Sequence, residues 1–109
     1  MKRLYRQRPF LEAVLQEANR RKRQDLLQHA NADQINAISE LALNLLKNNI
    51  PITLEIMATL RPRKDVLRSL SQRKLSLKKR RDMLLQQRGN RLFQGLYHCL
   101  CQYLNKRVS

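Results

Sequence analysis

Residues 31–51 read NADQINAISELALNLLKNNIP, and this stretch predicts a helix that is apolar around most of its circumference. Asn31 can cap the helix while Gln34, three residues on, returns the hydrogen bond, which is the spacing of a capping box. The helix should end at Asn48-Asn49, because the residue before Pro51 disfavours the helical conformation. A helix this apolar is usually buried between others, so we expect it at the centre of the fold.

The composition agrees with an all-helical chain of 109 residues, since Leu occurs 21 times whereas Val, Ile and Thr together occur ten times. This length suits one small domain with flanking segments. We therefore predict an all-α fold, a small bundle of five to six short helices. It is preceded by a basic N-terminal arm, which is either ordered or flexible. The expected segments are the basic arm and first helix (1–30), the helical core with a basic surface (31–89) and a C-terminal amphipathic helix (90–109).

Further helices are predicted on both sides of the central one. Apolar spacing indicates a helix from about Pro9 to Leu27, with its basic run near the C-terminus, where the helix dipole favours cations. Cap residues and breaks indicate short helices that start at Thr53, near Pro62 and at Ser76, followed by a last one after Gly89. The core expected from these patterns comprises Ile35, Ile38, Leu41, Ala42, Leu45, Leu46, Leu54, Met57, Leu67, Leu70 and Leu84.

Nothing in the sequence points to catalysis or to a cofactor. The eight acidic residues are scattered, and two glycines cannot form a glycine-rich phosphate loop. His98 and Cys101 have helical spacing, but a structural metal site needs further ligands. We predict a non-enzymatic protein without metal or cofactor. The cysteine pair and the lack of a signal peptide or membrane-length apolar run favour an intracellular location.

The charge of +15 is distributed unevenly along the chain. Residues 61–91 hold twelve basic residues against two acidic ones, residues 1–24 hold eight against two, and residues 25–60 hold one against four. Solvated helix faces usually mix signs, so this segregation predicts a polyanion-binding surface. The candidate contacts are Arg61, Arg63, Lys64, Arg68, Arg73, Lys74, Lys78, Lys79, Arg80 and Arg81, with Arg20, Arg21, Lys22 and Arg23 secondary.

Scarce aromatic residues and the absence of a sequence-reading motif favour contacts to phosphates, hence sequence-independent binding of duplex DNA. Two other functions remain open: an interaction module that docks on an acidic partner such as a capsid, and a membrane-active protein. The latter would use the apolar face of residues 92–104, which follows Arg88 and Arg91. That face could instead pack on the core or on a second copy of the chain.

The run from Asn31 to Pro51, together with Val66–Leu70, Leu75–Arg81 and Leu84–Gly89, resembles small basic proteins of adintoviruses and related Maverick elements. Those proteins have been likened to adenovirus core protein X, the mu precursor, which condenses DNA in the virion. The resemblance implies a viral or transposon nucleoprotein, located in the host nucleus or the virion. The chain differs from that pattern in its longer N-terminal arm and in its more polar tail, where Asn90 stands in place of a second glycine.

Overall fold

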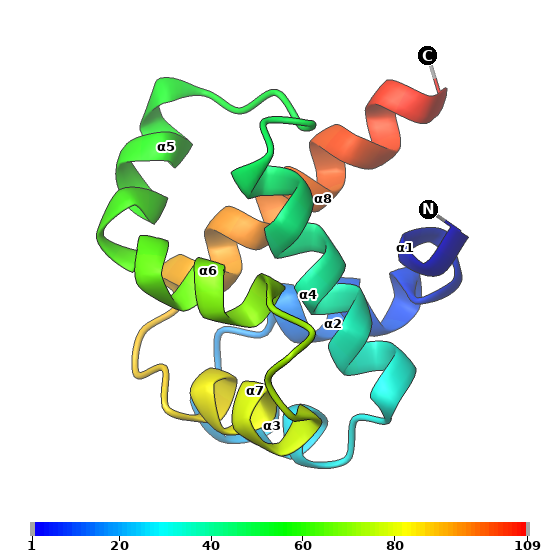
Figure 1. The fold of residues 1–109 in the computed structure, drawn as a ribbon, viewed down its shortest axis with the longest axis vertical. Coiled ribbons are helices and arrows are strands. Elements are labelled where there is room, and N and C mark those ends of the chain that lie inside the picture. The colour runs from blue at the N-terminus through cyan, green and yellow to red at the C-terminus, as the bar shows by residue number, and fades with distance from the viewer. Residues whose placement is uncertain (1, 109) are drawn as a thin grey trace.

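The computed structural model describes residues 2–108, with side chains described for residues 2–105, and the all-α prediction is confirmed (Figure 1). The described chain contains helices and no strand. In order along the chain they are α1 (Lys2–Arg6), α2 (Arg8–Gln16), α3 (Arg20–Gln28), α4 (Ala32–Leu46), α5 (Leu54–Leu60), the 3-10 turn η1 (Arg61–Arg63), α6 (Lys64–Ser71), α7 (Leu77–Leu85) and α8 (Arg91–Val108).

Helix α4 is the predicted central helix, and its start is as expected. The Asn31 side chain accepts from the Gln34 amide at 2.9 Å, and the Gln34 side chain accepts from the Asn31 amide at 2.8 Å. Its end has a cause beyond Pro51. Asn48 takes a left-handed conformation (φ 57°), and the amides of Asn48 and Asn49 donate to the carbonyls of Leu45 and Asn44. These two hydrogen bonds form a Schellman motif. It could not be recognised from the sequence, because Asn48 occupies the position where glycine is usual.

The single helix predicted from Pro9 to Leu27 is wrong, because it divides into α2 and α3. The chain turns extended at Glu17, and the Asn19 side chain then caps α3 by accepting from the amides of Arg21 and Lys22. The basic run at residues 20–23 therefore lies at a helix N-terminus rather than at a C-terminus. The arm before Pro9 is also helical in part, since α1 packs on α4 and buries Leu4 completely.

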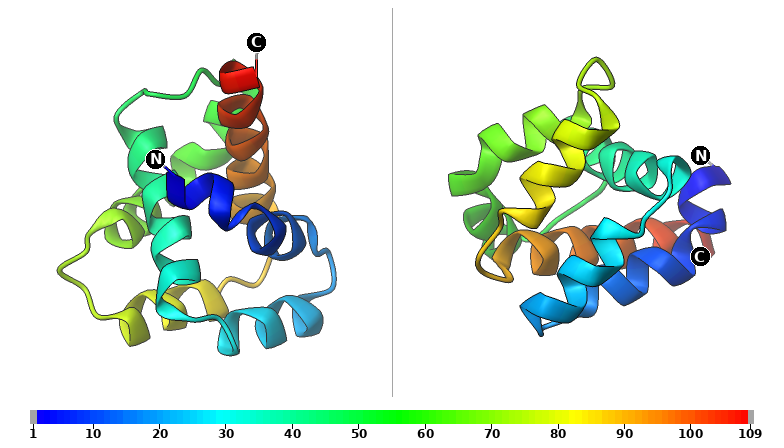
Figure 2. Two further views of the ribbon diagram at one scale, coloured as in Figure 1. Left: turned by 90° about the vertical axis from the view of Figure 1, so that its right-hand side faces the viewer. Right: turned by 90° about the horizontal axis from the view of Figure 1, so that it is seen from below.

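The helices are arranged around α4, against which α1, α2, α6, α7 and α8 all pack. Helix α8 also packs against α2 and α5. Helices α3 and α7 pack against each other and form the lower end of the molecule in the view of Figure 1, which the turned views confirm (Figure 2). All three segments predicted from sequence contribute to one hydrophobic cluster, from Leu4 to Leu104.

Burial confirms most of the predicted core, with two corrections. Leu54 is 83% exposed and Met57 38% exposed, because Leu60 is the residue that α5 turns toward the core. Conversely, Leu11, Val14 and Leu27 were missing from the prediction and are fully buried. The apolar face of α8 is buried within the same chain, including Leu96 and Leu100. The described chain contains no helix long and apolar enough to cross a membrane.

Gly95 allows α5 and α8 to approach closely. A Cβ added at this position would lie 2.7 Å from Leu60 Cγ, which is closer than carbon atoms pack. A glycine inside a helix costs about 1 kcal/mol relative to alanine. The close approach of Leu60 explains why a glycine is nevertheless accommodated here.

We expect Gly95→Ala to lower the free energy of unfolding by about 1–3 kcal/mol, the usual cost of overpacking, despite the better helix propensity of alanine. Gly89→Ala is the matched control, because an added Cβ there meets nothing within 4 Å. Urea denaturation of both variants measures the difference. Gly95→Ala combined with Leu60→Ala should cost less than the sum of the two single changes. A stabilising Gly95→Ala would contradict the close packing of α5 on α8.

Candidate nucleic-acid interface

Helices α3 and α7 run antiparallel as one layer, and side-chain hydrogen bonds hold them in register. At one end, the Arg23 guanidinium donates to the carbonyl of Gly89 at 3.3 Å, just beyond the C-terminus of α7. In the middle, the Gln24 side chain donates to the Leu85 carbonyl at 3.1 Å. At the other end, Arg81 donates to the Ala30 carbonyl at 2.7 Å, just beyond the C-terminus of α3. The two basic runs, residues 20–23 and 78–81, thus belong to opposite ends of the same layer.

Both helices carry exposed cations, and we call this pair of helices the α3–α7 layer. The exposed cations are Arg20, Arg21 and Lys22 of α3, Lys78 and Lys79 of α7, and Arg88, which follows α7. Acidic side chains in these segments are fewer: Glu17, Asp25 and Asp82. Arg73 and Lys74, also exposed, lie in the turn that leads into α7. Sequence reasoning had counted Arg88 in the total charge but not among the contacts, since it stands apart from the basic runs.

Both basic runs occupy the first turns of their helices, where the helix dipole is positive. Neither α3 nor α7 has an acidic residue in its first turn. An exposed cation at this end of a helix is repelled by the dipole, which lowers the stability of the helix by about 0.3–1 kcal/mol. The caps Asn19 and Ser76 offset part of this cost, because each accepts a hydrogen bond from a first-turn amide. A helix start that carries cations is a good place for phosphate, since free amides and side-chain charges act together.

Burial removes Arg23 from the predicted contacts. Its side chain is 1% exposed, and its guanidinium lies 4.2 Å from the centre of the Phe93 ring. The guanidinium also donates to Asn90 Oδ1 at 2.5 Å and to the Glu17 carbonyl at 3.2 Å. Burial, and secondarily the charge of Arg20, lowers the pKa of Arg23. Arg23 ties α3 to the start of α8 and has no donor directed at solvent phosphate.

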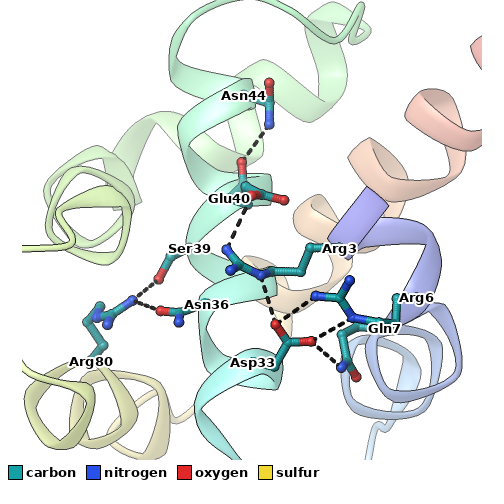
Figure 3. Close-up of polar contacts among 9 residues, drawn as sticks. All are labelled: Arg3, Arg6, Gln7, Asp33, Asn36, Ser39, Glu40, Asn44 and Arg80. Carbon is teal, nitrogen blue, oxygen red and sulfur yellow. Dashed lines mark hydrogen bonds and ion pairs between the residues drawn. The ribbon is translucent and has the colours of Figure 1, made fainter. Parts of the chain in front are cut away.

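Arg80 is likewise a structural residue, at 4% exposed (Figure 3). It donates to Ser39 Oγ at 2.7 Å and to Asn36 Oδ1 at 2.9 Å, both on α4. Burial, and secondarily the charge of Arg73, lowers the pKa of Arg80. Arg81 is half-buried at its contact with Ala30. Of the run at residues 78–81, only Lys78 and Lys79 are therefore fully available.

The cations of η1 and α6 lie on another part of the surface. Arg61, Lys64 and Arg68 are exposed there, whereas Arg63 is half-buried and donates to the Thr59 carbonyl at 2.9 Å. Arg61 and Lys64 border an apolar groove between α4, α5 and α6. The predicted single basic stretch from Arg61 to Arg81 thus spans η1, α6 and α7, and Arg61 and Lys64 lie at the groove rather than in the α3–α7 layer. A turn at residues 72–76 connects α6 to α7, which lies below α6 in Figure 1 and packs against it.

Two N-terminal cations, Arg3 and Arg6 of α1, form ion pairs with acidic residues of α4 (Figure 3). Asp33 accepts from Arg6 Nη2 at 2.9 Å, from Arg3 Nε at 3.0 Å and from Gln7 Nε2 at 2.5 Å. The hydrogen bonds from Arg6, and then from Gln7 and Arg3, hold the pKa of Asp33 well below its usual range. Glu40 accepts a further bond from Arg3 at 3.3 Å. These pairs dock α1 on α4 and reduce the charge that the arm presents to a polyanion.

The residues singled out for metal chemistry take other roles. Cys99 is completely buried, and burial raises its pKa to about 12, so it packs as a small apolar side chain. His98 and Cys101 are half-buried on α8. Among the residues that the structure describes, no group of three or more potential ligands lies close enough to hold a metal ion.

Comparisons of the chain with protein-family models, curated proteins and solved structures find no match.

Arg23→Ala should lower the free energy of unfolding by about 2–3 kcal/mol, because buried carbonyls lose a charged donor. In a domain of this size that is a decrease in melting temperature of roughly 10 °C. Arg21→Ala, at an exposed position of the same helix, should leave stability unchanged or raise it by up to about 1 kcal/mol, because it removes a first-turn cation. Thermal and urea denaturation measure both. Equal effects of the two substitutions would show that Arg23 is not the tie between α3 and α8.

The Asp33 contacts predict a dependence of stability on pH. Because folding lowers the pKa of Asp33, its contribution is present above the unfolded pKa of about 3.9 and is lost as the pH falls below it. Asp33→Asn should therefore be less stable than the wild type at pH 6, and this difference should shrink below pH 4. Urea denaturation of both proteins between pH 2.5 and 7 tests it. A difference that is constant across this range would exclude the charge of Asp33 as its source.

Proposed function

We propose that the protein is a non-enzymatic, sequence-independent binder of duplex DNA that condenses or packages it through the α3–α7 layer. The observation that carries the proposal is that the two helices with the basic runs, far apart in the sequence, pack against each other and both carry exposed cations. Contacts to phosphates by such side chains supply the affinity of non-specific DNA binding, through release of counterions.

The placement of these cations argues against a purely structural role. Cations in the first turn destabilise a helix, and none of Arg21, Lys22, Lys78 and Lys79 is paired with a carboxylate among the residues that the structure describes. Where the fold needs an arginine, as with Arg23 and Arg80, the side chain is buried and hydrogen-bonded instead. The exposed cations therefore cost stability and are best explained by an anionic partner.

The dimensions of the layer suit duplex DNA. Both helices have nine residues, a length of about 13 Å. Because they are antiparallel, the cations of the two first turns are separated along the layer by a comparable distance. The major groove of B-DNA is about 12 Å wide, so the two clusters can contact the backbones on its two sides. A protein of this size and charge fits a core nucleoprotein of a virus or transposon, acting in the nucleus or the virion.

Binding should depend steeply on salt and not on sequence. With six to eight phosphates contacted, the slope of log K against log salt should be roughly −5 to −7. Lys78→Glu/Lys79→Glu should weaken binding to two unrelated duplexes alike and reduce the slope by about 2. Fluorescence anisotropy across a salt series measures both quantities.

Lys2→Glu/Lys47→Glu is the matched control, because it changes the net charge equally at exposed positions outside the layer. It should reduce affinity much less than the change at Lys78 and Lys79. A slope near −1, a hundred-fold preference for one duplex, or equal losses in the two double variants would contradict the proposal. If the protein bound single-stranded or duplex RNA clearly more tightly than duplex DNA of equal length, RNA would be the ligand instead.

A further inference from the structure

An apolar groove lies between the C-terminal end of α4, α5 and α6. In Figure 1, α5 and the C-terminal end of α4 lie at the upper end of the molecule, whereas α3 and α7 form its lower end. It has a volume of about 310 Å³, the lower end of the range for binding pockets. Its floor is apolar, with Leu46, Ile52, Leu60 and Leu67 among the lining residues. Met57 forms one wall and is 38% exposed.

Apolar surface continues beyond the groove along α5. Leu54, one turn before Met57 and on the same face of the helix, is 83% exposed. The exposed large hydrophobic residues of the described chain are Leu54, Met57 and Tyr5, so two of the three gather at this place. Isolated exposed leucines are ordinary, whereas a groove with an apolar extension is typical of a binding surface.

The charged groups that line the groove are both basic, namely Arg61 and Lys64, and no acidic side chain is among its described lining residues. Neither Arg61 nor Lys64 makes an ion pair within the described part of the chain. An apolar floor with a cationic edge complements a ligand that is apolar on one side and anionic beside it. A concave surface of this kind accepts a protruding ridge, such as one face of a helix.

We propose that this groove binds an acidic amphipathic helix of a partner protein. Two or three apolar side chains of that helix, spaced i, i+3 or i+4, enter beside Met57, while its carboxylates meet Arg61 and Lys64. A second copy of the chain fits poorly, because a symmetric contact through Leu54 and Met57 would bring the same two cations of each copy together, within a protein of charge +15. A lipid surface fits poorly as well, because it would contact the protruding Leu54 and leave the recessed side chains of the groove uncovered.

The test uses the full chain and fluorescein-labelled 16-residue peptides in which leucines at i, i+3, i+4 and i+7 alternate with glutamates. A scrambled peptide of the same composition keeps the charge and removes the apolar stripe. We expect the striped peptides to bind at least ten-fold more tightly than the scrambled one. Met57→Glu and Lys64→Glu should each weaken binding of the striped peptides at least ten-fold, whereas Ala58→Glu, exposed on α5 outside the groove, should not.

DNA binding provides a separate measurement. Lys78→Glu/Lys79→Glu should weaken DNA binding and leave binding of the striped peptides unchanged. Met57→Glu should weaken peptide binding and leave DNA binding unchanged. Each proposal can therefore fail without the other. Equal binding of striped and scrambled peptides, or no binding of either, would overturn the groove proposal. So would a concentration-dependent dimer in sedimentation that Met57→Glu dissociates, or binding to vesicles of phosphatidylserine and phosphatidylcholine that Met57→Glu abolishes.

Discussion

The structure depends on the burial of α4. Helices α1, α2, α6, α7 and α8 each pack on it, and Ile35, Ile38, Leu41 and Ala42 are completely buried between them. An apolar helix of 15 residues is long enough to serve as the common surface for short helices that are marginal alone. Polar residues of α4 also hold neighbouring helices in place. Asp33 holds α1, and Ser39 holds Arg80 of α7.

The second constraint is that a small domain must accommodate 23 basic residues. The structure does so in three ways. Arg23 and Arg80 are buried, where each exchanges water for several oxygen acceptors. Arg3 and Arg6 are paired with the acidic residues of α4. Other cations are exposed to solvent, such as those in the first turns of α3 and α7, where they repel one another and the helix dipole. A bound polyanion would relieve that repulsion, so binding and folding should stabilise each other.

The two proposed surfaces divide the exposed charge by its surroundings. Cations of the α3–α7 layer stand on polar helix faces, as suits contact with phosphates, whereas Arg61 and Lys64 border apolar side chains. A protein that binds DNA at one end and an acidic helix at the other can connect packaged DNA to a protein shell. The proposed groove would give such a connection specificity that charge alone does not provide, since apolar contacts require complementary shape as well as complementary charge.

The sequence by itself determined the helical class, the central helix with its capping box, and the caps at Thr53 and Ser76. These features depend on spacing within a few residues, which local chemistry decides. It did not locate the break between α2 and α3, because no proline or glycine marks the break and residues 19–25 contain no apolar residue that would show a change of helix face. Nor could it distinguish Arg21 from Arg23, or place Arg61 and Lys79 on different surfaces. Which basic side chain is buried depends on carbonyls more than 60 residues away, as with Arg23 and Gly89, and only tertiary packing brings those together.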